Sequence, residues 1–347
     1  MNVRVLRVVA GAIALCFAAL AGVGVAPTMA QAKKDLVVYS ARKESLIRPT
    51  IQAFQDETGI TVTLLTGKAG ELARRIEIEQ GDPQGDVFLG TAAGISELLR
   101  RRGLLAPYVS RHAGAIPPEF RAADGTWIGI TGRVRVILYN KDLVDATDLP
   151  TSFFELTDPK WKGKVALASM GERTTVSWLA AIMALKGEDF TTQYVRALKA
   201  NDLKVLRNNT EVRRAVASGE YPLGITNHYY YMLHLDEEPE SPLGILYPDQ
   251  GAGQMGTPMA TITAAIIRGA AHMNEATRFI DFLLQPRGNL LLVKGKYELP
   301  LLNGVRPVGE EKGVKGLGEF KRAPVTQARM ADFEPLVEKR FGTLLIP

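Results

Sequence analysis

Short apolar runs alternate with amphipathic stretches through the first third of the chain. Residues 35–40 form an apolar run of strand length that ends in a small polar residue. In residues 46–58 the apolar positions recur at helical spacing on one face, and Gly59 supplies a stop at the C-terminal end. The same pattern, continued, predicts strands at residues 35–40, 60–65 and 86–89 and helices at residues 46–58, 70–79 and 94–102.

Two long β-prone stretches interrupt this alternation. Residues 127–139 alternate apolar and polar positions and are rich in β-branched side chains, which predicts extended backbone, and residues 258–267 resemble them. These stretches are the candidates for crossings between two lobes. The remaining pattern predicts strands at 165–169 and 222–226, helices at 175–185, 190–200, 211–218 and 274–284, and irregular segments at 156–161 and 297–303.

The order of strands and helices predicts an α/β fold in which each lobe has a central sheet flanked by helices. Ligands of such sheets bind outside the carboxyl ends of the strands. The segments that follow Tyr39 and Leu89 are therefore candidate binding loops, and so is the run 227–231, which follows the strand predicted at 222–226.

The first 32 residues have the pattern of a secretory signal peptide. Arg4 and Arg7 precede an apolar run over residues 8–25, and the sequence Ala-Gln-Ala at 30–32 has the small residues of a cleavage site. The apolar run is also long enough for an uncleaved membrane anchor, and the Ala-Gln-Ala exit favours cleavage. The sequence therefore predicts an exported protein.

Composition narrows the class of protein. A chain of 347 residues, 46% hydrophobic and 23% charged, is long enough for two lobes and excludes a disordered tail protein, a collagen-like fibre and a polytopic membrane protein. Its net charge of +5 is spread along the chain without blocks of like charge, so a nucleic-acid partner is not indicated. Cys16, the one cysteine, lies within the predicted signal peptide, and any metal of the mature chain would use oxygen or nitrogen ligands.

Three consecutive tyrosines, Tyr229, Tyr230 and Tyr231, are the sharpest local feature. A phenolate is a hard oxygen donor, and a hard trivalent cation such as ferric iron holds it deprotonated far below its ordinary pKa of about 10. Two adjacent phenolates on a loop can reach one ion. Alternatively, the rings fill a cleft between lobes or stack on an organic ligand.

Three arginines are the second candidate feature. Arg42 follows the first predicted strand, and Arg133 and Arg135 alternate with apolar residues and so share one face of theirs. Guanidinium groups bind carboxylate, carbonate and phosphate through paired hydrogen bonds. Residues 169–175 open a predicted helix, whose free N–H groups favour an anion. For each residue alone, salt bridging or helix capping is the alternative interpretation.

The chain has no HExxH motif, no GxGxxG fingerprint and no nucleophile elbow. With no catalytic constellation, the sequence predicts a binding protein and not an enzyme.

Five segments in register resemble the periplasmic ferric-ion-binding proteins of ABC transporters. They are LVVYSARKE at 36–44, DVF at 86–88 with LLAP at 104–107, GRVRVILYN at 132–140, SGEYPLGITNHYYY at 218–231, and KYELPLLNGV at 296–305. The resemblance implies a type II periplasmic-binding-protein fold, two lobes joined by two hinge strands, which closes on its ligand and presents it to an inner-membrane ABC permease.

The resemblance also implies site residues. Tyr229 and Tyr230 match the family's iron-binding tyrosines, and Arg133 and Arg135 fall in the segment with the anion-coordinating arginine. Glu44 is expected as a third iron ligand by position alone. The other residues expected to bind the anion or ligand are Arg42, Thr91, Thr174, Thr175 and Tyr231.

The chain departs from the family at other ligand positions. Lys43 or Glu44 stands where many members have a histidine, Gly90-Thr91 replaces a glutamate, and residues 173–175 contain no tyrosine. Two cargoes therefore stay open. One is ferric iron, Fe(3+), with carbonate, phosphate or citrate as a synergistic anion; the other is a small organic anion, a phosphorylated compound or a thiamine-like ligand.

The expected protein is a monomeric, periplasmic solute-binding component of an ABC importer that functions in iron transport. Its expected partners are the permease and a small ligand or metal ion, with no nucleic acid. The implied division of the chain is a signal peptide at 1–32, one lobe from 33–131 and 260–305, and a second lobe from 132–259 and 306–347.

Overall fold

The computed structural model describes residues 35–347, so the predicted signal peptide lies outside the described residues. A first group of strands and helices forms around the amino-terminal strands. Its strands are β1 (Asp35–Ser40), β2 (Thr61–Thr66), β3 (Val87–Gly90), β4 (Leu105–Ala106), β10 (Met259–Ile267) and β11 (Leu299–Pro300). Its helices are α1 (Glu44–Thr58), α2 (Ala69–Ile78), α3 (Ala93–Arg101), α8 (Met273–Leu283) and α9 (Pro286–Lys294).

A second group forms around the strands of the middle of the chain. Its strands are β6 (Val165–Ala168), β7 (Lys204–Leu206), β8 (Leu223–Asn227) and β9 (Leu243–Leu246). Its helices are α4 (Arg173–Lys186), α5 (Glu188–Ala200), α6 (Asn209–Ala217) and α7 (Tyr229–Glu237), and the chain ends with α10 (Gln327–Phe341). No helix among the described residues combines the length and apolarity that a membrane crossing needs.

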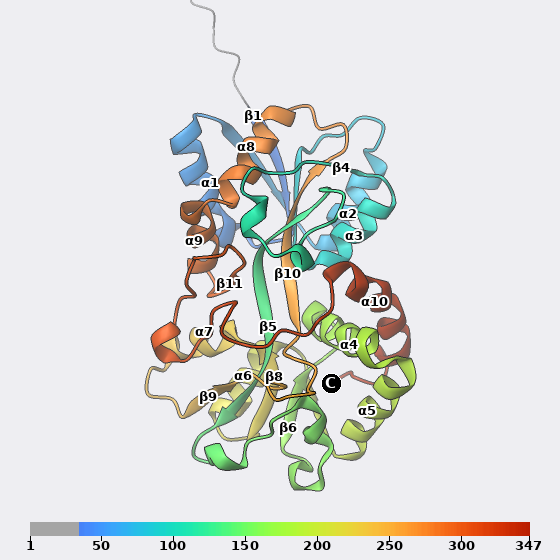
Figure 1. Ribbon diagram of the computed structural model, residues 1–347, viewed down its shortest axis with the longest axis vertical. Helices are drawn as coiled ribbons and strands as arrows, with labels where there is room; N and C mark the ends of the chain where they lie inside the picture. The colour runs from blue at the N-terminus through green and yellow to red at the C-terminus, as the bar shows by residue number, and fades with distance from the viewer. Residues whose placement is uncertain (1–34) are drawn as a thin grey trace, which may run out of the picture. The chain divides into compact units, whose positions relative to one another are not determined.

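One long strand, β5 (Ile128–Asn140), joins the two groups, as Figure 1 shows. Its first half pairs with β10 and its second half with β8 and β9, all antiparallel. The strand order is β2-β1-β3-β10-β5-β8-β6-β7. The β1–β2, β1–β3, β6–β7 and β6–β8 pairs are parallel. The long extended segment predicted at 127–139 thus pairs with strands of both groups.

Parallel pairing brings the carboxyl ends of neighbouring strands to one edge in each group. β1 and β3 end at Ser40 and Gly90, and β6 and β8 end at Ala168 and Asn227. Helices α1, α3, α4 and α7 each follow one of these four strands within a few residues. Their first turns therefore lie at the edges where α/β proteins bind ligands.

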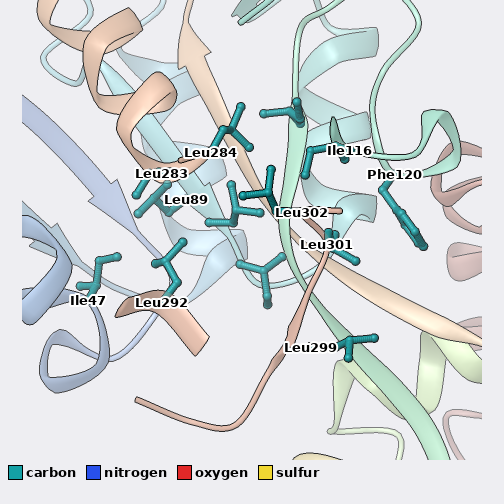
Figure 2. Packing of buried hydrophobic residues seen from close by; sticks show 14 of the residues in the cluster. Ile47, Leu89, Ile116, Phe120, Leu283, Leu284, Leu292, Leu299, Leu301 and Leu302 are labelled. Atoms are coloured by element: carbon teal, nitrogen blue, oxygen red, sulfur yellow. The ribbon is translucent and has the colours of Figure 1, made fainter. Parts of the chain in front are cut away.

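Apolar residues at helical and strand spacing supply the core of the first group (Figure 2). Ile47 of α1, Leu89 of β3, Leu283 of α8 and Leu292 of α9 are all fully buried there. Each such side chain contributes about 1.5–3 kcal/mol of hydrophobic stabilisation. The second group has its own core, in which Phe153 packs against Trp178 with ring centroids 5.3 Å apart.

Some elements differ from those that the pattern predicts. The elements that lie outside the predicted ones are β4, β7, β9, β11, α9 and α10. The strands among them have two to four residues, too few for periodicity to reveal. The run of tyrosines, expected on a loop, is the first turn of α7. Gly59 ends α1 as expected, with a φ of 69° that a residue without Cβ adopts freely.

Candidate functional site

A cavity of about 600 Å³ opens where the two groups of elements meet at the carboxyl ends of their strands. Tyr229, Tyr230 and Thr174 line it from the second group, and Arg42 and Thr91 from the first. The remaining lining residues are Ala41, Lys43, Leu46, Arg133, Gly171, Glu172, Arg173, Arg207, Asn208, Thr210, Glu211, Arg214 and Lys296. The cavity thus gathers six of the ten sequence-predicted site residues.

Three helices begin at this cavity. The first turns of α4, α6 and α7 contribute lining residues, among them Thr174, Thr210 and Tyr229. The N-terminal N–H groups of a helix lack partners within the helix, and its dipole is positive at that end. This backbone arrangement favours a ligand with negative charge.

The two lining tyrosines lie against each other. The ring centroids of Tyr229 and Tyr230 are 4.4 Å apart, and their planes are inclined by 31°. Tyr229 is buried and Tyr230 half-buried. Burial raises the pKa of Tyr230 well above its ordinary value, and the charges of Tyr229 and Glu172 add to the rise while Arg133 opposes it. Only a strong cation would therefore hold Tyr230 as phenolate at neutral pH.

Tyr231 points elsewhere. It is buried in the hydrophobic core that also contains Ile47 and Leu89, and its hydroxyl donates to the carbonyl oxygen of Lys312 over 3.1 Å. Successive residues of a helix are about 100° apart, so three consecutive tyrosines cannot share one face. The expectation that Tyr231 lines the ligand site assumed a loop, and the structure does not bring this residue to the cavity.

Glu298 anchors the arginines beneath the tyrosines. Its Oε2 accepts from Arg42 Nη1 at 2.7 Å and from Thr131 Oγ1 at 2.7 Å, and its Oε1 accepts from Arg133 Nε at 3.1 Å and Nη2 at 3.0 Å. Although burial disfavours the charged carboxylate, Arg42 and Arg133 lower the pKa of Glu298 to about 2. The two arginines thus carry a net charge of about +1 together with this carboxylate.

Lys296 is a lining residue that the sequence analysis did not select. It is half-buried, and its Nζ lies 5.4 Å from the ring centroid of Tyr229. The guanidinium carbon of Arg133 lies 5.7 Å from the same centroid. Burial and the nearby charges of Arg133, Arg42 and Lys43 lower the pKa of Lys296 to about 8, while Glu298 opposes the shift.

Arg135 lies deeper and is not part of the cavity lining. Its guanidinium contacts only neutral oxygens: Nη2 donates to Thr175 Oγ1 at 3.2 Å, and Nη1 donates to Asn209 and Asn227 Oδ1 at 3.3 Å each. Burial lowers the pKa of Arg135 to about 10. Thr174 receives a longer contact of 3.5 Å from the same Nη1. Arg135 therefore supports the start of α4 from below.

Glu44 lies outside the cavity lining. It is the first residue of α1, it is exposed, and its carboxylate accepts from Arg48 one helical turn later. A glutamate in this position interacts favourably with the helix dipole and forms an i,i+4 pair. The structure therefore does not bring Glu44 to the tyrosines, whereas Glu172, which immediately precedes α4, lines the cavity beside them.

The lining is strongly basic. Seven of its residues are lysine or arginine (Arg42, Lys43, Arg133, Arg173, Arg207, Arg214 and Lys296), and two are acidic (Glu172 and Glu211). Part of this charge is already paired, since Arg173 bonds Glu334 and Arg207 bonds Glu211. Within residues 35–347, no group of three or more His, Cys, Asp or Glu side chains converges to a metal site. The donors and charges present suit an anionic ligand or a metal that arrives with anions.

A second cavity, of about 610 Å³, lies beside α3 and is lined by Glu97, Arg100 and Trp127 among others. The Glu97 carboxylate there accepts from Arg100 at 2.7 Å and 2.8 Å, from Arg101 at 2.9 Å and from Trp127 Nε1 at 3.2 Å. Because these donors occupy the carboxylate, this network is structural, and the candidate site is the cavity with the tyrosines.

Sequence reasoning missed Lys296, Glu298 and Glu172. The first two fall in the segment KYELPLLNGV, whose resemblance to the family was visible although its role was not. Glu172 falls within the 169–175 stretch selected for its helix start. Only tertiary structure shows that they gather around Arg133 and the tyrosine pair.

Comparison with known proteins identifies the family of the chain. A model of the bacterial extracellular solute-binding proteins matches residues 82–315. Iron uptake protein A1 of Synechocystis sp. is 33% identical over 299 residues, which is 83% of this chain and 81% of that protein.

Solved structures are also similar to the chain. Iron-bound HitA from Pseudomonas aeruginosa is 28% identical, with a TM-score of 0.78 over 89% of this chain and 99% of that one. A Trichodesmium protein in complex with iron and citrate is 25% identical, with a TM-score of 0.80 over 89% of this chain and 98% of that one. The two-lobed α/β fold expected from the sequence is thus confirmed, and the chain belongs to the bacterial extracellular solute-binding proteins, which are transport components and not enzymes.

Proposed function

We propose that this chain binds ferric iron together with a carboxylate-bearing anion and delivers it to an inner-membrane ABC permease. The observation that carries the proposal is the pair Tyr229 and Tyr230, stacked at the wall of a basic cavity. Two phenolates are hard donors matched to a hard trivalent ion. Relatives named for iron uptake and ferric-iron binding support this cargo.

The chemistry of binding follows from the surroundings of the tyrosines. Both phenols lose a proton when they ligate the ion, and the positive charges of Arg133 and Lys296 lie over the Tyr229 ring, where they stabilise a phenolate. Two phenolates leave most of the coordination sphere of ferric iron open. An anion with several oxygens fills it, and the basic lining compensates the charge of that anion.

We propose a carboxylate anion because the lining of the cavity is basic. The Trichodesmium protein in complex with iron and citrate is a precedent among similar structures. Glu172 is the lining carboxylate whose charge reaches Tyr230 and is a further oxygen donor available to the ion. In this proposal, closing of the two lobes about β5 and β10 completes the site, because the ligand binds the closed form more tightly than the open one.

Replacement of single tyrosine hydroxyls tests the proposal. The mature chain with ferric citrate is expected to show a phenolate-to-iron absorption band with about one iron per chain. Tyr230→Phe is expected to lose this band or shift it strongly. Tyr231→Phe is the matched control, because it removes a hydroxyl that bonds Lys312 in the core, and it should keep the band.

Either of two results would overturn the proposal. One is a colourless wild-type protein that takes up no iron, which together with thermal stabilisation by citrate alone would indicate an organic-anion binder. The other is a Tyr230→Phe variant whose band equals that of the wild type.

A further inference from the structure

We propose that Lys296 is a ligand-binding residue that contacts a carboxylate of the bound ferric chelate, and that the segment Lys296-Tyr297-Glu298 selects a polycarboxylate chelate over ferric iron with a simple anion. The inference rests on the proposed function and names the chemistry of its anion. Lys296 forms part of a positively charged wall of the cavity and faces the ring of Tyr229.

Glu298 has no free acceptor position for Lys296. A carboxylate has about four acceptor positions. In Glu298 these are taken by one bond each from Arg42 and Thr131 and two from Arg133. Among the described residues Lys296 forms no ion pair, so its ammonium is available to a ligand.

The backbone beside Lys296 has an unusual conformation. Tyr297 has a φ of 55°, in the left-handed region that a non-glycine residue seldom adopts. Its hydroxyl bonds Asp236 in α7, the helix that begins with Tyr229 and Tyr230. The bent backbone allows Lys296 to line the cavity while Glu298 anchors the arginines. A non-glycine residue in this backbone conformation is often found at functional sites.

The charges around Lys296 favour an anionic ligand. Lys296 lies near Arg133, Arg42 and Lys43, and the Glu298 carboxylate opposes their repulsion. Half-buried like charges are unfavourable together unless an anion joins them. Ferric iron with two phenolates keeps one positive charge, so the iron alone does not provide that anion. A chelate with several carboxylates does, and Lys296 is the flexible ammonium that reaches one of them.

The test compares two lysines of the same lining. Lys296→Met and Lys43→Met each remove one positive charge and keep most of the length of the side chain, and Lys43 is exposed at the rim. Affinity is measured by titration of the phenolate-to-iron band with ferric citrate and with ferric iron supplied with bicarbonate. We expect Lys296→Met to weaken ferric citrate binding at least about tenfold and Lys43→Met less than about threefold.

Selectivity separates ligand contact from a general structural role. Lys296→Met should weaken the citrate complex more than the bicarbonate complex, and Lys296→Arg, which keeps the charge, should restore most of the citrate affinity. Thermal unfolding of each ligand-free variant checks that it folds. A Lys296→Met variant that does not fold is replaced by Lys296→Gln.

The outcomes are distinct. Equal citrate affinity in Lys296→Met and the wild type overturns this inference and leaves the proposed function intact. Equal losses in Lys296→Met and Lys43→Met, or equal losses for citrate and bicarbonate, also overturn it, because they indicate a diffuse effect of charge. A wild-type protein that binds no ferric complex overturns the proposed function itself.

Discussion

At the scale of single residues, the site depends on a few buried charges with defined partners. Glu298 receives hydrogen bonds from two arginines and a threonine that lie far from it in sequence, and its side chain is fully buried. Arg133 connects this carboxylate to the tyrosine pair, because its guanidinium bonds Glu298 and lies over the ring of Tyr229. The orientation of Arg42 and Arg133 in the cavity therefore depends on one carboxylate.

Glu298→Gln tests this dependence through pH. The folded-state pKa of Glu298, about 2, is below its ordinary value of 4.5, so its contribution to stability is complete above pH 4.5 and is lost as the pH falls toward 2. At pH 7 we expect the variant to lose about 3 kcal/mol of unfolding free energy, because the buried arginines lose their charged partner. Urea unfolding at several pH values measures the difference.

The exposed pair Glu57 and Arg287 provides the control, since Glu57→Gln should change stability by less than about 0.5 kcal/mol. Between pH 5 and pH 3, the stabilities of wild type and Glu298→Gln should converge. Parallel curves over this range would show that folding does not lower the pKa of Glu298.

At the scale of elements, α10 joins the two groups of helices. Glu334 of α10 bonds Arg173 and Ser177 of α4, and Asp332 bonds Arg101 of α3. The Glu334 carboxylate also lies where a Cβ on Gly94, the second residue of α3, would be placed. The starts of α3 and α4, which flank the cavity, are thus coupled through the last helix.

Gly94→Ala is expected to destabilise the protein by about 1–3 kcal/mol, because the added methyl group overlaps the Glu334 carboxylate. Gly70→Ala is the matched control: Gly70 is the second residue of α2 and has no atom within 4 Å of the position of its Cβ. There the exchange should stabilise by about 0.5–1 kcal/mol. Thermal unfolding of both variants measures the contrast, and equal effects would disprove the close contact at Gly94.

At the scale of the whole molecule, β5 and β10 position two sets of strand ends around one basic cavity. The chain also carries a net charge of +5, so long-range and local fields have the same sign. Such a field attracts an anionic ligand and raises its association rate.

We therefore expect the association rate of ferric citrate, measured by stopped-flow absorbance, to fall about tenfold between low salt and about 0.5 M NaCl, since salt screens charges beyond a few ångströms. The dissociation rate should change much less, because it depends on contacts inside the closed site. An association rate independent of salt would show that the excess of basic side chains does not guide the ligand.

The pattern of residue types was sufficient to predict most elements and the chemistry of the candidate donors. Periodicity located β1, α1, β5 and most other elements to within a few residues, because burial imposes the 2.0 and 3.6 residue repeats directly on side-chain types. The position of Arg42 and of the tyrosine pair after strands followed from the same pattern, since parallel strands bring their carboxyl ends together.

Which of these donors lie close together depends on the tertiary structure. The turn of α7 directs Tyr229 and Tyr230 to the cavity and Tyr231 to the core, and α1 leaves Glu44 paired with Arg48 in solvent. Lys296 and Glu298 join the site from the far end of the chain. Contacts between residues so distant in sequence depend on how sheets and helices pack, and a local pattern of polar and apolar residues does not encode them.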